Sequence, residues 1–480
     1  MASRSRKLEE EANQNEALLK DPTWEDDYGF LYTPQPRRSI AKVAACTLLA
    51  LLTLVTTVSV MSYRNGAMFS GKMQLVSVSI VHANGAQSSD TRQTWEDAYW
   101  PEGYGELTVS GMQQMYRLGQ TFRQRYVELL GFLPEHTMAA RDAVQVRAIA
   151  LDRTEESALT SMMGLFDQDH EDLKKMPEQC PCRPLKGDDT QRVSGPSCLS
   201  SCMGLSKTIS SKEVPLIEVL PLKYDWLLRQ NTVCKGWEPG SEGVDRFVSA
   251  KHKFKRVFDD AVQFLGADRL CHFTIRNGTD GDRVCSGDPL SLRNLEPLYF
   301  NLLCAETAGR ECPADAGLDC RKLLSIVHPV KEFLWNHDFN SANAVKAGGM
   351  LLGEILENMK RARRWHVPAA KQPKDEDGGA PPKLYVYSGE PLNVAALMGS
   401  LKAPWFKAPL FGSYVAIELW APRKDDQLAN EEKWMVNVRF DGRPLKDLPG
   451  CKHGYCRFKD FFYKLFWTQA MYKEDCEVRQ

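Results

Sequence analysis

The sequence predicts an α/β fold that carries an inserted, mostly helical domain. Two observations predict it. Apolar runs typical of strands alternate with amphipathic helical patterns over residues 72–170, and further strand-like runs return over 345–480. Between these two parts, residues 171–344 are richer in cysteine, proline and short helical patterns. We therefore expect a core made of 72–170 and 345–480, with 171–344 as a helical cap.

The elements of the first half follow from their hydrophobic period. Residues 75–81, LVSVSIV, are apolar and β-branched, which is typical of a buried strand, and the polar stretch HANGAQSS after them predicts a strand-end loop. From Thr108, apolar residues recur at helical spacing as far as Leu130. A second strand over 143–149 and a helix over 152–166 complete the order strand, helix, strand, helix.

The second half returns to the same alternation. Residues 348–364 have a helical pattern, and 366–383, HVPAAKQPKDEDGGAPPK, form a linker too polar and too rich in proline and glycine to bury itself. Three runs of aliphatic and aromatic residues then predict strands over 384–388, 414–420 and 434–440.

An uncharged segment near the start predicts a membrane anchor. Residues 43–63 give 21 residues without a charge, about 31 Å as a helix, which is enough to cross a bilayer. A cleaved signal peptide is the alternative, but its apolar part would be shorter and closer to the start. Basic residues crowd the N-terminal flank more than the other, so the N-terminus is expected in the cytosol. We expect a cytosolic tail over 1–38 and a transmembrane signal anchor over 39–63.

This topology makes the protein a single-pass type II membrane protein of the secretory or endolysosomal system or the cell surface. Of its 14 cysteines, all except Cys46 follow the anchor, where disulfides persist. The cluster of Cys180, Cys182, Cys198 and Cys202 favours disulfides over zinc, because no histidine lies among these cysteines.

Asn277-Gly-Thr279 is an N-glycosylation pattern, with an unmodified surface turn as the alternative. The balance of 61 basic against 62 acidic residues excludes a nucleic-acid partner.

Five motifs in a fixed order resemble the histidine acid phosphatase family across most of the part after the anchor. The first two motifs are GELTVSG at 105–111, followed by RQRY at 123–126, and RAIALDRT at 147–154. The third consists of Pro221-Leu222, Asp225, Leu227-Leu228 and Cys234, and the fourth is GGMLLGEILENMK at 348–360. The fifth consists of Gly450-Cys451, Cys456, Phe458 and Phe461.

The resemblance implies fold and chemistry together. Such proteins have helices on both faces of a mixed sheet and a helical cap, with the active site at the strand ends. They hydrolyse phosphomonoesters through a phosphohistidine, with no metal or other cofactor, and many form homodimers. A disulfide between Cys451 and Cys456 is also implied.

The catalytic loop departs from the family's form, Arg-His-Gly-x-Arg-x-Pro. His82 matches the nucleophile, but Val81 and Gly85 stand at the two arginine positions, Ala83 at the glycine and Gln87 at the proline.

Of the family's catalytic residues further along the chain, some are replaced and one is retained. The His-Asp pair after the strand at 384–388 is replaced by Gly389 and Glu390. Arg147 is taken as the match to the third arginine of the family and as the substrate-binding residue, with an ion pair to a carboxylate as the alternative. Glu390 is the candidate acid, with a solvated loop residue as the alternative. Arg92 is close enough in sequence to His82 to swing into the vacated space, although no motif supports this.

These departures predict a pseudophosphatase with a binding or assembly role. Phosphoryl transfer needs several cations on the dianionic group, and the loss of one preorganised donor costs about 10² to 10³ in rate. One alternative is an active acid phosphatase with His82 as nucleophile. Another is a luminal module that binds a phosphorylated or sulfated glycan, an anionic ligand, through Arg147.

Overall fold

The computed structural model divides the chain into two units, Met1–Ser70 and Gly71–Gln480, and the described residues all lie in the second. The predicted tail and anchor, 1–38 and 39–63, fall outside them. Within the described part, no helix is long and apolar enough to span a membrane. The described residues are 72–93, 100, 103–135, 141–166, 216–229, 259, 272–276, 279–284, 292–310, 320–339, 343–368, 379–404, 407–448, 450–452 and 454–475.

A mixed sheet forms the centre of this unit, with the strand order β11-β12-β9-β8-β1-β7-β3-β4 and with β10 paired to β9. Strand β1 is parallel to β7 and antiparallel to β8, and β7, β3 and β4 continue in parallel. The bounds are β1 Met73–Ala83, β3 Val144–Ile149, β4 Ile217–Leu220, β7 Leu384–Gly389, β8 Tyr414–Pro422, β9 Met435–Phe440, β10 Arg443–Pro444, β11 Cys451–Lys452 and β12 Tyr455–Arg457.

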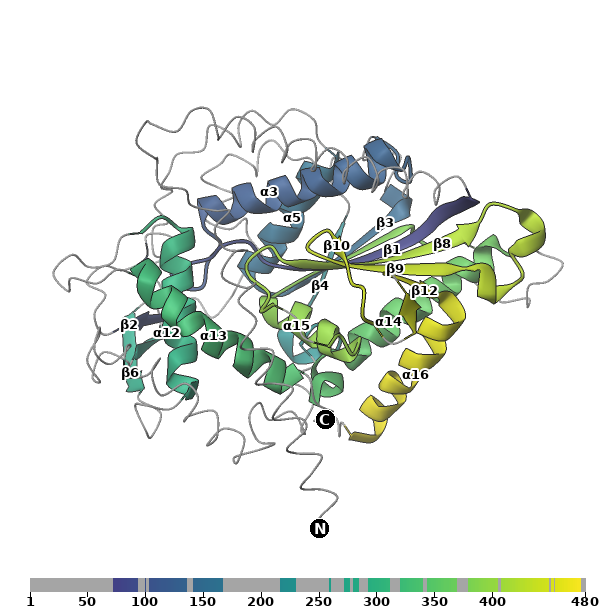
Figure 1. The fold of residues 1–480 in the computed structure, drawn as a ribbon. Coiled ribbons are helices and arrows are strands. Elements are labelled where there is room, and N and C mark those ends of the chain that lie inside the picture. The colour runs from purple at the N-terminus through teal and green to yellow at the C-terminus, as the bar shows by residue number, and fades with distance from the viewer. Residues whose placement is uncertain are drawn as a thin grey trace, which may run out of the picture. The chain divides into compact units, whose positions relative to one another are not determined.

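Helices cover both faces of the sheet, which confirms the predicted fold class (Figure 1). Because side chains alternate along a strand, Ile80, Val146 and Val386 pack on one face with helices α3 and α5, whereas Val81 and Tyr387 pack on the other with α14 and α15. The bounds are α3 Val109–Arg123, α5 Asp152–Phe166, α12 Leu292–Thr307, α13 Cys320–Phe339, α14 Asn343–His366, α15 Pro391–Ser400 and α16 Phe458–Asp475.

The segment predicted as a cap contributes strands as well as helices. Strand β4 pairs in parallel with β3 and extends the main sheet. A separate sheet joins β2, Thr91–Gln93, from the loop after β1, to β5 and β6, His272–Arg276 and Thr279–Val284. In this sheet, β2 comes from the segment assigned to the core and its partner strand comes from the segment assigned to the cap.

The three parallel strands β1, β7 and β3 end at the same edge of the sheet. His82 lies opposite Ser388, Ala83 opposite Gly389, and Ala148 also opposite Ser388. Carboxyl ends of neighbouring parallel strands are where α/β folds build their sites. The far end of the sheet carries the hairpin of β11 and β12, in which Cys451 is bonded to Cys456.

Candidate functional site

The candidate site is built by the residues that directly follow the three parallel strands. Asn84 follows β1, and its backbone N–H donates to the Gly389 carbonyl at the end of β7, 2.8 Å away. Glu390 comes next and begins helix α15, where its own backbone N–H donates to the Asn393 side chain at 2.8 Å. Arg153 lies in the first turn of α5, close after β3. The end of the sheet thus brings residues from segments that are distant in sequence close together in space.

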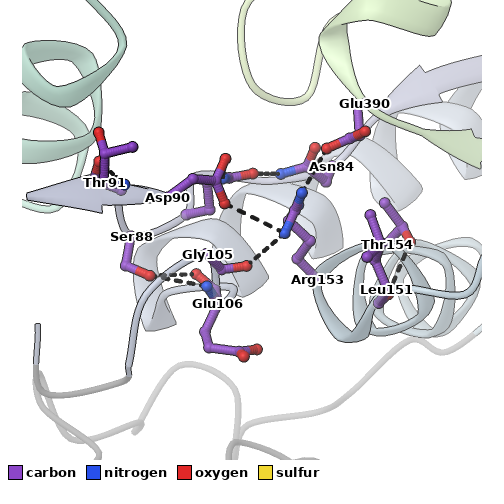
Figure 2. A network of polar contacts seen from close by, with 12 residues as sticks. Asn84, Ser88, Asp90, Thr91, Gly105, Glu106, Leu151, Arg153, Thr154 and Glu390 are labelled. Atoms are coloured by element: carbon purple, nitrogen blue, oxygen red, sulfur yellow. Dashed lines mark hydrogen bonds and ion pairs between the residues drawn. The ribbon is translucent and has the colours of Figure 1, made fainter. Parts of the chain in front are cut away.

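Arg153 is the centre of the polar network in Figure 2. Its guanidinium donates from Nη2 to Glu390 Oε1 at 2.6 Å and from Nη1 to the Gly105 carbonyl at 2.9 Å. Asp90 Oδ1 lies 3.6 Å from Nη1. A second guanidinium, that of Arg229, reaches Glu390 Oε2 at 3.3 Å. The Glu390 carboxylate is therefore held between two arginines from different segments.

A chain of amides connects the end of β1 to Asp90. Asn84 Nδ2 donates to Gln87 Oε1 at 2.6 Å and to the Gly85 carbonyl at 2.9 Å. Gln87 Nε2 donates in turn to Asp90 Oδ2 at 3.4 Å. Both partners of Asn84 Nδ2 are oxygen acceptors, so the orientation of the amide is fixed. Its Oδ1 is buried and receives no hydrogen bond from any described residue.

His82, the predicted nucleophile, is completely buried at the end of β1. Its Nδ1 lies 3.0 Å from the Ala83 carbonyl, which can only accept, so Nδ1 carries the proton. Burial lowers the pKa of His82 to about 4, opposed by the Ala83 hydrogen bond. Above that pH the ring is neutral and Nε2 is an acceptor, for which the described residues offer no donor.

Arg147, the predicted substrate-binding residue, is held away from this network. It lies opposite Tyr387 in the register, so alternation puts it on the sheet face that packs with α14 and α15, whereas His82 lies on the face of α3 and α5. Its Nη2 donates to Asp225 Oδ1 at 2.7 Å, and Asp225 is fully buried. The arginine that the structure brings to the strand ends is Arg153, six residues further along RAIALDRT.

The positions where the family's motif has cations are filled by other packing. Val81 is fully buried in the core beneath α14 and α15. A Cβ on Gly85 would lie 2.4 Å from the Gly111 carbonyl oxygen, because the loop after β1 rests directly on the start of α3. A Cβ on Gly389 would lie 2.6 Å from Asn393 Oδ1, on the side chain that accepts from the Glu390 N–H.

The electrostatics around the start of α5 are acidic. Loss of hydration raises the pKa of Asp90. The positive charge of Arg153 lowers this pKa and partly offsets the shift, whereas the negative charge of Glu390 raises it further. Glu156 is 6% exposed, and burial raises its pKa to about 9, with the carboxylates of Glu106, Asp152 and Glu155 adding to the shift. Within the part of the chain that the structure describes, no three side chains of the metal-binding types are placed to hold an ion.

The other predicted residues lie outside this network. Arg92 is on β2 in the smaller sheet, opposite Phe273. Asn277 and the cluster of Cys180, Cys182, Cys198 and Cys202 lie outside the described residues.

Comparison with known proteins agrees with the motifs. The model of the histidine phosphatase superfamily (branch 2) matches residues 41–440. The chain belongs to this superfamily. Human prostatic acid phosphatase is 36% identical over 386 residues, 79% of this chain and 81% of the relative. Human lysosomal acid phosphatase is 26% identical over 377 residues, 77% of this chain and 71% of the relative.

A solved structure supports the superfamily fold. The phytase of Hafnia alvei in complex with tartrate matches with a TM-score of 0.54 and 13% identity, over 83% of this chain and 97% of that one. At this identity the likeness concerns the fold alone.

Sequence reasoning missed the residues that organise the site. Asp90 and Arg229 belong to no quoted motif, and Arg153 stands within RAIALDRT beside the arginine that was chosen instead. Position relative to the strand could have separated the two arginines, because Arg147 lies inside the predicted strand over 143–149, whereas Arg153 lies beyond its end in the first turn of the predicted helix over 152–166.

Proposed function

We propose that the protein is a catalytically impaired histidine phosphatase, a pseudophosphatase whose phosphatase-like domain has a binding or assembly role. One observation carries the proposal. Both guanidinium groups of the strand-end network, those of Arg153 and Arg229, are bound to Glu390, so the cations of the site neutralise the protein's own carboxylate.

The chemistry of the superfamily explains why this matters. A phosphoryl group in transfer spreads negative charge over its equatorial oxygens, and preorganised cations stabilise it. Here two of the motif's arginines are replaced by Val81 and Gly85, and its second histidine by Gly389. Each lost donor typically reduces the rate by about 10² to 10³, and even with strong non-additivity three losses leave little turnover.

The surrounding packing supports the same conclusion, because the vacated positions are occupied. An arginine side chain at position 85 would have to pass the Gly111 carbonyl, and a histidine at position 389 would meet Asn393. Restoration of these side chains therefore requires the β1 loop or the start of α15 to move.

An active acid phosphatase remains the second candidate, and one feature of His82 favours it. A neutral imidazole with an available Nε2 lone pair is the form that attacks phosphorus, and the lowered pKa keeps His82 in this form at pH 5. In that mechanism Glu390 would protonate the leaving group, after release from Arg153 and Arg229.

The two candidates are separated by hydrolysis of para-nitrophenyl phosphate between pH 4.5 and 6. We expect no turnover by the purified chain above that of His82→Ala, with human prostatic acid phosphatase as the positive control. Circular dichroism of both forms shows that each is folded. Hydrolysis that disappears in His82→Ala would establish the second candidate.

The place of action is proposed from the sequence and the relatives together. We infer a signal anchor over 39–63 with residues 72–480 in the lumen or outside, in line with relatives that include a lysosomal acid phosphatase. In cells, endoglycosidase treatment should increase the gel mobility of the wild-type chain and leave Asn277→Gln unchanged. Alkaline carbonate extraction that releases the chain from membranes would contradict the anchor.

A further inference from the structure

We propose that the strand-end site binds its ligand through a cationic hydrogen-bond donor, an ammonium or guanidinium group, where the family's motif would hold phosphate. This inference rests on the proposed loss of catalysis, because it names the ligand class of the same site. It reverses the sign of charge that the motif resemblance implies.

Charge is the first support. Around the single guanidinium of Arg153 lie the carboxylates of Glu390, Asp90 and Glu106, in that order of influence. Arg229 shares Glu390 with Arg153. The Asp90 side chain is 49% exposed and the Glu390 side chain 23%, so solvent and solutes reach both carboxylates. Asp90 is more exposed than Glu390 and both arginines, so the most accessible charge of these four side chains is negative and repels a phosphate dianion.

Unpartnered acceptors are the second, independent support. Figure 2 draws Asn84 within the network of Asp90, Arg153 and Glu390. The Oδ1 atom of Asn84 is buried and has no donor among the described residues, although both hydrogens of Nδ2 are used. A buried acceptor without a donor destabilises the protein, and a ligand N–H would remove that penalty.

His82, two residues before Asn84, also has a buried acceptor without a donor. His82 Nε2 is an acceptor in the neutral ring, and no described residue donates to it. Neither Asn84 Oδ1 nor His82 Nε2 can donate to a phosphate oxygen, but both can accept from an ammonium or guanidinium group. Asn84, between the motif's glycine and second arginine positions, therefore offers an acceptor where a phosphate site needs a donor, and His82 Nε2 is a second acceptor close to it in the chain.

The acidic start of α5 adds a longer-range field of the same sign. Glu156 Oε1 is buried and lacks a donor within the described ranges, and its pKa of about 9 reflects burial first and three neighbouring carboxylates next. A cation bound nearby favours the charged form of such a group, so binding is expected to release protons and to strengthen as the pH rises toward 9. The charged groups that act on Glu156 are the acids Glu106, Asp152 and Glu155, and Glu106 also acts on Arg153.

Titration calorimetry and amide NMR of the full chain in detergent test the proposal, with n-butylammonium as the probe, sodium orthophosphate as the opposite charge and n-butanol as the neutral analogue, at constant ionic strength. We expect saturable binding of butylammonium in the millimolar range and none of the other two. Asp90→Asn should bind it about tenfold more weakly, through loss of one charge-assisted contact. Asp460→Asn is the matched control, because that carboxylate is 44% exposed and lies 3.7 Å from Arg457, much as Asp90 lies from Arg153.

Each outcome decides the question. Orthophosphate binding tighter than that of butylammonium overturns the proposal, as does the absence of amine binding or equal binding by wild type and Asp90→Asn. N-acetyl-lysine amide and butane-1,4-diamine then separate a protein side chain from a free polyamine as the source of the ammonium group. The hydrolysis assay reports on catalysis separately, so an inactive chain that binds phosphate would refute this inference and leave the proposed function intact.

Discussion

Two carboxylates in this molecule are held by arginine, and their surroundings differ. Glu418, in the middle of β8, is fully buried and accepts from Arg125 Nε at 2.6 Å, Arg125 Nη2 at 2.8 Å, the Tyr126 hydroxyl at 3.0 Å and Trp420 Nε1 at 3.3 Å. Glu390, at the strand ends, is partly exposed and lies beside acceptors that have no donor among the described residues.

The difference distinguishes a structural element from a site. A buried charge is tolerated when its hydrogen-bonding capacity is fully used, as it is at Glu418. At the strand ends the capacity is only partly used, which destabilises the fold and has to be offset elsewhere. Incomplete satisfaction is common where proteins bind ligands, because the ligand supplies the missing partners.

The largest expected effect comes from the fully satisfied pair. Arg125→Met leaves Glu418 buried with only neutral donors, and we expect unfolding free energy to fall by about 3 to 5 kcal/mol in urea titration. Arg153→Met is the matched variant at the strand ends, where Arg229 remains and water reaches Glu390, so a loss of about 1 kcal/mol is expected. Equal losses in the two variants would remove the distinction between the regions.

The pH dependence of stability should reveal the buried histidine. Since the pKa of His82 falls from 6.5 in the unfolded chain to about 4 in the fold, the unfolded state binds more protons between these values. The contribution of neutral, buried His82 to the free energy of unfolding is fully present above pH 6.5. It decreases by up to about 3 kcal/mol as the pH falls to 4.

The measurement is the difference in unfolding free energy between wild type and His82→Gln from pH 4 to 7. Glu156 acts in the opposite direction, because its raised pKa makes stability fall as the pH rises from 4.5 toward 9. It contributes equally to both proteins, so it cancels in the difference. A difference that stays constant with pH would show that His82 titrates normally.

A smaller effect is expected from the loop that forms the site. Gly85→Ala brings a Cβ to within 2.4 Å of the Gly111 carbonyl, and relief of that overlap should cost about 1 to 3 kcal/mol in thermal unfolding. Gly379→Ala is the control, because nothing lies within 4 Å of its Cβ and its φ, like that of Gly85, is outside the left-handed region. A Gly85→Ala variant as stable as wild type would mean that the loop can shift, and that the motif's second arginine could be accommodated.

Much of the fold could be predicted from sequence, because hydrophobic period is a local property. The strand predicted over 75–81 lies within β1, and the runs predicted over 143–149 and 384–388 correspond to β3 and β7. The helix predicted over 152–166 has the observed bounds. The strands within 171–344 were not predicted, because β4, β5 and β6 are short and owe their pairing to partners distant in the chain.

The candidate site was predictable only in part. His82 and Glu390 were identified from motif positions, and both lie at the strand ends. Arg147 was selected by the same reasoning, but the side-chain alternation of β3 places it on the opposite face and Asp225 neutralises it.

The sequence alone shows that the family's two loop arginines and its second histidine are replaced, because the residues at positions 81, 85 and 389 carry no charge in any conformation. It also predicts the order of strands and helices within 72–170 and 345–480, because hydrophobic period depends on neighbours along the chain. Which charges face one another follows from the tertiary fold and not from the local sequence. Coulombic and hydrogen-bonding partners are chosen by distance in space, and Arg153 and Glu390 are 237 positions apart in the chain but 2.6 Å apart in the fold.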